Sequence, residues 1–431
     1  YRTVGDIPGQ VDLAVVTVPA IQSLKLIPEL KAKGIRYMLL ISSGFGEVGP
    51  EGRELEKKLI RTAAEAGVSV LGPNTMGICN PHIKFYCIGS PCWPKAGSIG
   101  LLSQSGNLGT QLMAFAEAEG IGIRSFCGSG NEAMITIEDY LRTSALDEVT
   151  KSIILYVESI KDGKRFFKTA QSVSRKKPVV VLKGGRTSAG SRAAASHTGA
   201  MASNIKILNA ACRQAGIVLA DQPMDLLDLS AAFSSLPLPR GKRVAIMTLG
   251  GGWGVVTTDL CVENGLEIPH LTPDVIARID QILPPFWSKE NPVDLVGEMG
   301  ADVPVKVLEI LARWDQCDAI IHLGVVGRLR LINTMIQAAR DSGQEIQQEF
   351  YEMGIKLYQD SEADVFKYSA ELMMKYQKPI LGVFLDDVHS KTITEVPGSP
   401  YSGIAFLTPE RAVKVLSKMV SYNHWLEREG I

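Results

Sequence analysis

The sequence predicts an α/β protein whose parallel sheets have helices between their strands. Short β-branched runs alternate with longer segments of helical periodicity, which is the pattern of parallel strands joined by crossover helices. The chain has 431 residues, of which 45% are hydrophobic, so it can fill several cores. We expect three domains, because single domains usually contain about 50–250 residues.

Residues 1–95 predict a Rossmann-like first domain. Its expected strands are 11–18, 37–41 and 68–71, and its expected helices are 21–33 and 51–66. A unit of this kind normally opens with a strand and a glycine-rich phosphate turn, and neither precedes Val11. We therefore expect this domain to lack its N-terminal part.

Two further α/β domains are expected, at residues 96–236 and 242–431. A loop rich in Pro, Gly and Cys (81–97) precedes the second domain, and a linker-like stretch (234–241) precedes the third. The expected strands are 99–103, 123–127, 153–157 and 179–183 in the second domain, and 244–248, 319–323 and 380–385 in the third. The long, charged stretch 331–376 indicates an added helical excursion.

Composition excludes several classes of partner. The net charge of −1 and pI near 6.7 give no basic face for nucleic acid. No apolar run reaches bilayer length, and the first residues do not resemble a signal peptide. The seven cysteines are scattered and form no C-x-x-C pair, which favours reduced thiols, no zinc site and a cytoplasmic location.

The segment after the strand 99–103 could bind phosphate. It consists of Ser103, Gln104, Ser105, Gly106 and Asn107 and leads into a helix-like stretch at 110–119. Small residues at a helix N-terminus leave backbone N–H groups exposed, and the helix dipole adds about half a positive charge there. The alternative is a Ser or Asn helix cap after a tight turn.

The segment 183–200 is small, flexible and basic, and it contains His197 shortly before a helix. Such a loop can deliver an imidazole to a phosphoryl group while its Lys and Arg residues offset the charge. Alternatively, a lone histidine serves as a helix cap or as a satisfied polar group.

Glu158 follows the expected strand 153–157. A carboxylate at a strand end can accept a hydrogen bond from one imidazole nitrogen and leave the other free to attack phosphorus. The alternative is an acid that caps a helix or faces water.

Two other segments are less suggestive. Asp386, Asp387 and His389 follow a strand, but adjacent acids at a strand end usually face water, so we expect no metal site. The run 249–254 is rich in glycine but contains Trp253, and a lone glycine-rich turn is a weak signal of phosphate binding. We expect a structural turn there.

Taken in order, these loops resemble the α subunit of succinyl-CoA synthetase and, more closely, the ADP-forming acetyl-CoA synthetases. The motifs that carry the resemblance are Ser103-Gln104-Ser105-Gly106, His197-Thr198-Gly199-Ala200, Val18-Pro19-Ala20, Ser42-Ser43-Gly44-Phe45-Gly46-Glu47, Gly72-Pro73-Asn74 and Asn291-Pro292-Val293-Asp294. The resemblance covers nearly the whole chain and implies a CoA-binding domain followed by two flavodoxin-like domains.

The resemblance also implies roles for particular residues. His197 would carry a phosphoryl group, Glu158 would steady it, and Thr198 and Gly199 would join the Ser103–Asn107 segment in binding phosphate. The CoA-binding residues would be Val18, Pro19, Ser43, Gly44 and Asn74.

The implied function is that of the α-type part of an ADP-forming acyl-CoA synthetase, an acid–thiol ligase that works through an acyl phosphate and a phosphohistidine. CoA, phosphate and a small carboxylic acid would be its ligands. ATP or ADP and Mg²⁺ would be bound by an ATP-grasp partner, as a β subunit or fused domain, so we expect a homo- or hetero-oligomer.

Two alternatives are a non-catalytic CoA-binding regulatory module of a synthetase-like protein acetyltransferase and a domain of a citrate-cleaving CoA lyase. The histidine argues against the first, and Asn291-Pro292-Val293-Asp294 argues against the second. The acyl group is not readable from the sequence, although we expect residues 130–132 to border its pocket.

Overall fold

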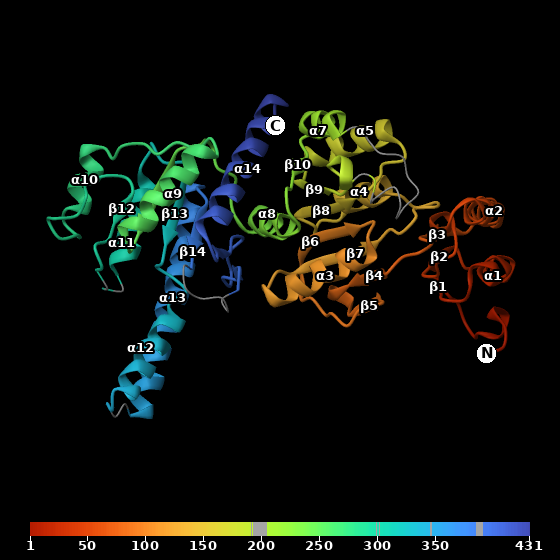
Figure 1. Cartoon of the computed structure of the whole chain (residues 1–431), viewed down its shortest axis with the longest axis horizontal. Helices are drawn as coiled ribbons and strands as arrows, with labels where there is room; N and C mark the ends of the chain where they lie inside the picture. Colours follow the sequence, from red (N-terminus) through yellow and green to blue (C-terminus); the bar gives the residue numbers. More distant parts are fainter. Residues whose placement is uncertain (191, 193–204, 299, 301, 345–346, 385–390) are drawn as a thin grey trace. The chain divides into compact units, whose positions relative to one another are not determined.

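The computed structural model describes residues 1–190, 192, 205–298, 300, 302–344, 347–384 and 391–431 (Figure 1). It divides into two compact units, Tyr1–Ser230 and Ala231–Ile431. The described residues form three sheets, of which the first two belong to the first unit and the third belongs to the second.

The first sheet is parallel, with the strand order β1-β2-β3. Its elements are β1 (Leu13–Val16), α1 (Ala20–Lys33), β2 (Tyr37–Leu40), α2 (Pro50–Ala66) and β3 (Ser69–Leu71), with 3-10 turns at Val4–Asp6 and Gly46–Val48. Both helices end at a glycine in the left-handed region, Gly34 with φ 82° and Gly67 with φ 71°, where a Cβ would add strain. The expected strands and helices of this region are confirmed.

One face of this sheet packs against both helices. Its buried core contains Val16, Met38, Leu40 and Val70 from the strands, Leu24, Ile27 and Leu30 from α1, and Leu59 and Ala63 from α2. Residues two apart along a strand point to the same face, so Met38 and Leu40 lie on one face, and the strand register puts Val16 and Val70 beside them. The loops that follow the three strands therefore emerge together at one edge of a rigid layer.

The second sheet has seven strands in the order β10-β9-β8-β6-β7-β4-β5. Its elements are β4 (Gly77–Asn80), β5 (Phe85–Ile88), β6 (Ala96–Ser103), α3 (Gly106–Ala118), β7 (Ile123–Gly128), α4 (Ile137–Leu146), β8 (Ser152–Val157), α5 (Gly163–Ser174), β9 (Val179–Lys183), α7 (Ile205–Gln214), β10 (Val218–Leu219) and α8 (Pro223–Ser235). The strands from β10 to β7 are parallel. All four strands expected here are confirmed, and their apolar runs are those of a sheet covered on both faces.

The expected loop at 81–97 is wrong in part. Residues 77–88 form an antiparallel hairpin of β4 and β5, with a 3-10 turn at Pro81–Ile83, and β4 pairs with β7. The flanking prolines and glycines hid the β-prone run Phe85–Ile88. The chain therefore enters the second sheet before residue 95, where we expected the first domain to end.

The third sheet has the order β12-β11-β13-β14-β16-β15 and is parallel except for β15. Its elements are β11 (Val244–Thr248), α9 (Gly251–Glu263), α10 (Pro273–Ile279), β12 (Val293–Asp294), α11 (Val303–Arg313), β13 (Ala319–Leu323), α12 (Leu329–Asp341), α13 (Gln348–Tyr376), β14 (Ile380–Val383), β15 (Ile393–Thr394), β16 (Gly403–Phe406) and α14 (Pro409–Arg428). The helical excursion is confirmed as α12 and α13. α12 and the first part of α13 project away from this sheet (Figure 1), whereas the last turns of α13 are buried through residues such as Phe366 and Met373.

Two motifs of the third sheet have structural roles. The Asn291 side chain donates to the carbonyls of Val244 and Pro269 at 2.9 and 3.1 Å and accepts from Ile246 N at 2.9 Å, so it ties its loop to β11. The Gly250 amide donates to Thr248 Oγ1 at 3.1 Å where β11 turns into α9. A hydrogen bond to the end of the preceding strand thus holds the glycine-rich run, in agreement with the structural turn expected there.

The buried strands predict a large difference between two leucine truncations in the first unit. Leu155 on β8 is 0% exposed, whereas Leu146 at the end of α4 is 79% exposed. Leu155→Ala leaves a cavity and is expected to lower the free energy of unfolding by about 2–5 kcal/mol. Leu146→Ala is expected to change it by no more than about 0.5 kcal/mol. Urea unfolding measures both, and equal effects would contradict the placement of β8 in the core.

Candidate functional site

The three loops expected to bind CoA meet at the carboxyl edge of the first sheet. Ser42 Oγ donates to the carbonyl of Val18 at 2.6 Å, which joins the loop after β2 to the loop after β1. The Asn74 amide donates to the carbonyl of Ser42 at 3.0 Å, which joins the loop after β3 to the same point. Val18, Pro19, Ser43, Gly44 and Asn74 therefore belong to one continuous group of loops. Ligands of open α/β sheets bind at this edge.

Two carboxylates hold the loop after β2. Glu47 Oε1 accepts from the amides of Gly44 and Phe45 at 2.5 and 3.1 Å, and Glu56 Oε2 accepts from the amide of Gly46 at 3.0 Å. Burial acts to raise the pKa of Glu47, but hydrogen bonds from Asn131 and from these backbone amides outweigh it and hold the pKa below its usual value. Glu47 therefore stays ionised near neutral pH and keeps the loop in shape.

The expected phosphate segment lies at the carboxyl end of β6. Ser103 is fully buried, and its hydroxyl donates to the carbonyl of Ser105 at 2.6 Å. Ser105 is the N-cap of α3, where its Oγ accepts from the amide of Leu108 at 3.5 Å. Gly106 and Asn107 follow in the first turn, whose N–H groups have no partners within the helix itself. The cap and the anion seat are compatible, because they use different N–H groups.

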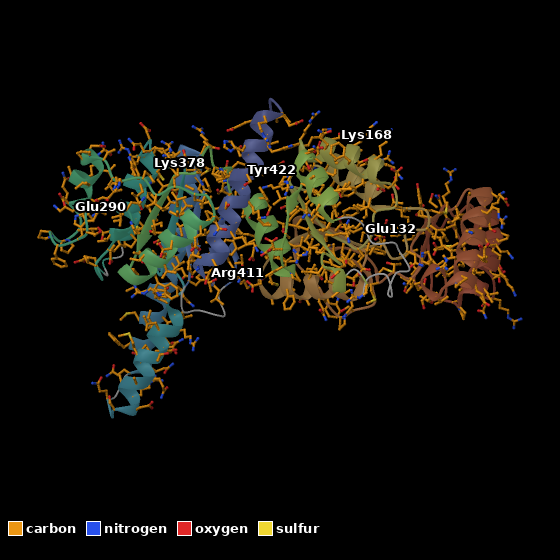
Figure 2. The ribbon with its side chains drawn as sticks, turned by 45° about the horizontal axis from the view of Figure 1, so that its top comes forward. Glu132, Lys168, Glu290, Lys378, Arg411 and Tyr422 are labelled. Carbon is orange, nitrogen blue, oxygen red and sulfur yellow. The ribbon has the colours of Figure 1, made fainter. Side chains whose placement is uncertain are left out.

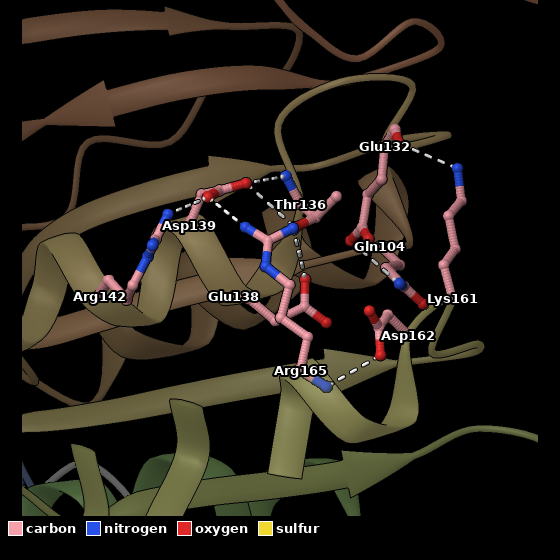
Figure 3. Close-up of polar contacts among 9 residues, drawn as sticks. All are labelled: Gln104, Glu132, Thr136, Glu138, Asp139, Arg142, Lys161, Asp162 and Arg165. Atoms are coloured by element: carbon pink, nitrogen blue, oxygen red, sulfur yellow. Dashed lines mark hydrogen bonds and ion pairs between the residues drawn. The ribbon is translucent and has the colours of Figure 1, made fainter. Parts of the chain in front are cut away.

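Gln104 uses its side chain within the protein. Its Oε1 accepts from the amides of Glu158 and Ser159 at 2.6 and 2.9 Å. Its Nε2 donates to the carbonyl of Ser159 at 2.8 Å and to Glu132 Oε1 at 3.0 Å (Figure 3). The Gln104 amide group thus joins the end of β6 to the loop after β8 and to the loop after β7.

Glu158 lies next to a buried cation at the ends of β8 and β9. Lys183 Nζ donates to the carbonyl of Glu158 at 2.7 Å and also to that of Gly184. Burial lowers the pKa of Lys183, and the nearby Glu158 partly opposes this shift. Burial and the neighbouring Glu158 raise the pKa of Tyr156 to about 12. This corner therefore combines a carboxylate, an ammonium group and a neutral phenol.

His197, Thr198 and Gly199 lie outside the described residues, between the end of β9 at Lys183 and the start of α7 at Ile205. Asp386, Asp387 and His389 also lie outside them. Within the described part of the chain, no group of three or more His, Cys, Asp or Glu side chains is arranged to hold a metal ion.

The loop after β7 lies between the two groups of loops. The amide of Asn131 donates to the carbonyl of Pro73 at 2.9 Å, and the amide of Ala133 donates to that of Gly72 at 2.9 Å. Asn74 Nδ2 donates to Asn131 Oδ1 at 3.3 Å. From the other side, Lys161 Nζ donates to the carbonyls of Asn131 and Glu132 at 2.7 and 2.9 Å (Figure 3).

Sequence reasoning noticed residues 130–132 but did not recognise their structural contacts. It missed the part that Lys161 plays, and it expected Lys183 to offset phosphoryl charge without foreseeing its bond to the carbonyl of Glu158. Gly-Asn-Glu after a strand was the available signal, because such residues often form tight, polar turns. The partners of these side chains lie far away in the sequence, so no local pattern could reveal them.

Comparisons with known proteins cover each part of the chain. Residues 1–81 match the family described as CoA binding domain, residues 96–233 match the succinyl-CoA ligase like flavodoxin domain, and residues 244–358 match the ligase-CoA domain. The chain is 35% identical over 428 residues to the α subunit of acetate–CoA ligase (ADP-forming) I of Pyrococcus furiosus, which covers 99% of this chain and 86% of the relative.

The chain belongs to the family of ADP-forming acyl-CoA ligase α subunits.

Other members of the ADP-forming acyl-CoA ligase family agree. One is 4-hydroxybutyrate–CoA ligase (ADP-forming) of Nitrosopumilus maritimus, 30% identical over 434 residues, with 99% of this chain and 57% of the relative covered. A solved structure of the dinucleotide forming acetyl-coenzyme A synthetase 1 of Ca. Korarchaeum cryptofilum, in complex with phosphate and ADP, superposes with a TM-score of 0.79. It is 30% identical, and the match covers 99% of this chain and 86% of that one.

These findings confirm several expectations drawn from the sequence. The resemblance, the α/β fold class with a CoA-binding domain and two ligase-type domains, and the assignment to acid–thiol ligases are all confirmed. The comparisons support the ligase interpretation and not the regulatory alternative.

All seven cysteines are free thiols. Among the helices described, none is long and apolar enough to cross a bilayer.

The buried carboxyl of Glu132 predicts a pH-dependent effect on stability. The residue is 4% exposed, and its burial raises the pKa; the hydrogen bond from Gln104 offsets this only in part. The folded state therefore binds this proton more tightly than the unfolded state does, so the wild type loses stability as the pH rises above about 4.5.

Glu132→Gln keeps an acceptor for Gln104 and removes this ionisation. The variant's stability relative to the wild type is therefore expected to improve between pH 5 and pH 8, as measured by urea unfolding at both pH values. An identical difference at the two pH values would show that Glu132 ionises as easily in the folded chain as in the unfolded chain.

Proposed function

We propose that this chain is the CoA-binding and phosphoryl-carrying part of an ADP-forming acyl-CoA ligase. It would interconvert acyl-CoA, phosphate and ADP with a carboxylic acid, CoA and ATP. The observation that carries this proposal is the junction between loops at the carboxyl edges of two sheets. The loops after β1, β2 and β3 are hydrogen-bonded through Asn74 and Asn131 to the loop after β7, which adjoins the start of α3.

CoA would occupy the carboxyl edge of the first sheet. Val18, Pro19, Ser43, Gly44 and Asn74 are the proposed contacts, and the match of residues 1–81 to a CoA binding domain supports this assignment. Gly44 and Asn74 both have positive φ, 102° and 57°, so the backbone there turns sharply and can approach a ligand closely.

Phosphate would bind at the start of α3. We propose that the N–H groups near Ser105, Gly106 and Asn107 bind it, together with Thr198 and Gly199 from the histidine segment, which is the segment 183–200 that contains His197. Ser103 and Gln104 would act in the same site by holding this turn in place, since both side chains bond to neighbouring backbone. Preformed donors of this kind stabilise negative charge without having to reorganise.

The proposed chemistry has three transfers. A phosphate oxygen attacks the thioester carbonyl, the C–S bond breaks, and CoA leaves as the thiol, giving an acyl phosphate. A ring nitrogen of His197 then attacks phosphorus, the bond from phosphorus to the acyl oxygen breaks, and the carboxylate leaves. Finally a nucleoside diphosphate oxygen attacks the phosphohistidine and frees the imidazole. The covalent phosphohistidine replaces one difficult direct transfer of the phosphoryl group by two easier transfers.

Glu158 would orient His197 by accepting a hydrogen bond from the other ring nitrogen. Its position at the end of β8, beside the end of β9 from which the histidine segment departs, supports this role. Lys183, which is bonded to the Glu158 carbonyl, places a positive charge near the transferred group.

The nucleotide and Mg²⁺ would be bound by an ATP-grasp partner. The α-subunit designation of the Pyrococcus furiosus relatives supports a separate partner chain. The acetate–CoA ligase (ADP-forming) I of Archaeoglobus fulgidus carries no subunit designation, and this chain covers 47% of it, which fits a fused arrangement. The acid would be a small carboxylic acid, and acetate and 4-hydroxybutyrate are those named for relatives.

A labelling experiment tests the phosphoryl carrier. The chain is mixed with a cognate ATP-grasp partner, Mg²⁺ and γ-labelled ATP, and acid-labile, base-stable label is measured on this chain. We expect the wild type to be labelled and His197→Ala to lose the label, because no other imidazole is proposed to act. A wild type without label, or a labelled His197→Ala, would contradict the proposal.

Glu158→Gln tests the orienting role separately. Its amide keeps the shape of the carboxylate but stabilises the ring less when the imidazole becomes charged. We expect labelling to continue at a rate lower by about 10²–10⁴-fold, which is the usual contribution of one side chain in general acid–base catalysis. An unchanged rate would remove Glu158 from the mechanism while leaving His197 in place.

A further inference from the structure

The loop at residues 129–136, between β7 and α4, makes hydrogen bonds in two directions. On one side it bonds the loops after β2 and β3, which together with the loop after β1 are called the CoA-side loops. On the other side it bonds residues 103 and 104 of the phosphate-side turn, which is the segment 103–107. Glu132 lies in this loop on the side of the second sheet that borders the first domain (Figure 2). The loop therefore determines the distance between two sites that the proposed reaction must bring together.

On the CoA side the contacts converge on the side chain of Asn131. Its Nδ2 donates to Glu47 Oε2 at 2.5 Å and to Glu56 Oε2 at 2.9 Å, and its Oδ1 accepts from Asn74 Nδ2 at 3.3 Å. The two carboxylates also hold the amides of residues 44–46. One amide side chain thus connects the loop after β2 with the loop after β3.

The backbone of the same loop lies against the Gly72–Asn74 turn with no free space between them. A Cβ added to Gly130 would lie 2.2 Å from the carbonyl oxygen of Pro73. Gly130 and Glu132 both have positive φ, 58° and 54°. A left-handed backbone is rare for glutamate and is kept only where the surroundings demand it.

On the phosphate side the contacts converge on Glu132 and Ser129. Glu132 Oε1 accepts from Gln104 Nε2 at 3.0 Å (Figure 3). Gln104 Oε1 in turn accepts from the amides of Glu158 and Ser159. The amide of Ser129 donates to the carbonyl of Ser103 at 3.0 Å. Lys161 Nζ donates to the backbone carbonyls of Asn131 and Glu132 in the same loop.

We propose that Asn131 and Glu132 are positioning residues that align the thioester of bound acyl-CoA with phosphate at the start of α3. Asn131 sets the CoA-side loops, and Glu132 sets the phosphate-side turn through Gln104. Asn131 is not required for the transfer from an acyl phosphate to His197, because its side chain contacts only the CoA-side loops. Glu132 affects both steps, because it holds Gln104 on the phosphate side. This inference rests on the proposed function.

Misalignment has a specific kinetic signature. Attack of phosphate on the thioester needs reacting atoms about 3–3.5 Å apart, and an error of about 1 Å can cost on the order of 100-fold in rate. The later transfer involves only atoms already bound on the phosphate side. Loss of alignment on the CoA side therefore slows the first step and spares the second, whereas a general loss of stability slows both.

The experiment compares two routes to the same phosphohistidine in the full chain without any partner. In the first, the chain receives acyl-CoA and [³²P]phosphate. Acetyl-, 4-hydroxybutyryl-, phenylacetyl- and succinyl-CoA are tried with the wild type, and the one that gives the fastest labelling is used. In the second, it receives the corresponding acyl [³²P]phosphate, which bypasses the thioester. The rate of single-turnover labelling is measured for each route.

Asn131→Ala is expected to slow the acyl-CoA route by about 10–100-fold and to leave the acyl phosphate route within about twofold of the wild type. Glu132→Ala is expected to slow both routes, because it removes the acceptor of Gln104 on the phosphate side. Glu132→Gln, which keeps an acceptor for Gln104, should recover most of both rates. Arg142→Ala is the matched control, because Arg142 belongs to the neighbouring surface pair with Asp139 and contacts neither loop (Figure 3). Both of its rates should equal those of the wild type.

The outcomes separate the two proposals. If the wild type is labelled by neither donor, the proposed function fails, and this inference fails with it. If the wild type is labelled by both donors and Asn131→Ala slows both routes equally, or neither, the proposed function stands and the positioning role is wrong.

Discussion

The hydrogen bonds of Asn131 are the constraint on which the proposed site depends. A buried or half-buried amide must have partners, since an unpaired polar group costs about 1–3 kcal/mol. Here the partners are two carboxylates and an amide from the first sheet's loops. Because these carboxylates also bind the amides of residues 44–46, moving the loop after β7 would leave several polar groups unsatisfied at once. The two edges therefore keep one relative position within the first unit.

This constraint explains why the site is built from loops of two sheets and yet needs little flexible structure. Parallel strands place their carboxyl ends along one edge, so each sheet supplies a row of loops on a rigid support. Gln104 connects loops of the second sheet as Asn131 connects loops of the first. Its side chain bonds the backbone of the loop after β8. The groups proposed to touch the ligands are thus mostly backbone N–H groups, while the side chains hold the turns.

Local sequence patterns were sufficient for the regular elements. The runs 153–157 and 179–182 are apolar apart from the hydroxyl of Tyr156 and are rich in Val and Ile, as is usual for buried parallel strands, and they lie in β8 and β9. The hairpin of β4 and β5 was missed because its strands are short, and its pairing with β7 joins residues that are distant in sequence. The site motifs were recognised through resemblance, but the partner of Gln104 was not, because a local pattern of small residues says nothing about where a long amide side chain points.

A structure of the full chain with CoA and phosphate both bound would test the central claim most directly. We expect the CoA thiol sulfur beside residues 130–132, with the pantetheine passing the loops after β1, β2 and β3. We also expect phosphate at the first turn of α3, on the other side of the Asn131–Glu132 pair and close enough to the sulfur for direct attack on a thioester. CoA bound elsewhere on the chain, or phosphate separated from the thiol by the width of a domain, would contradict this claim.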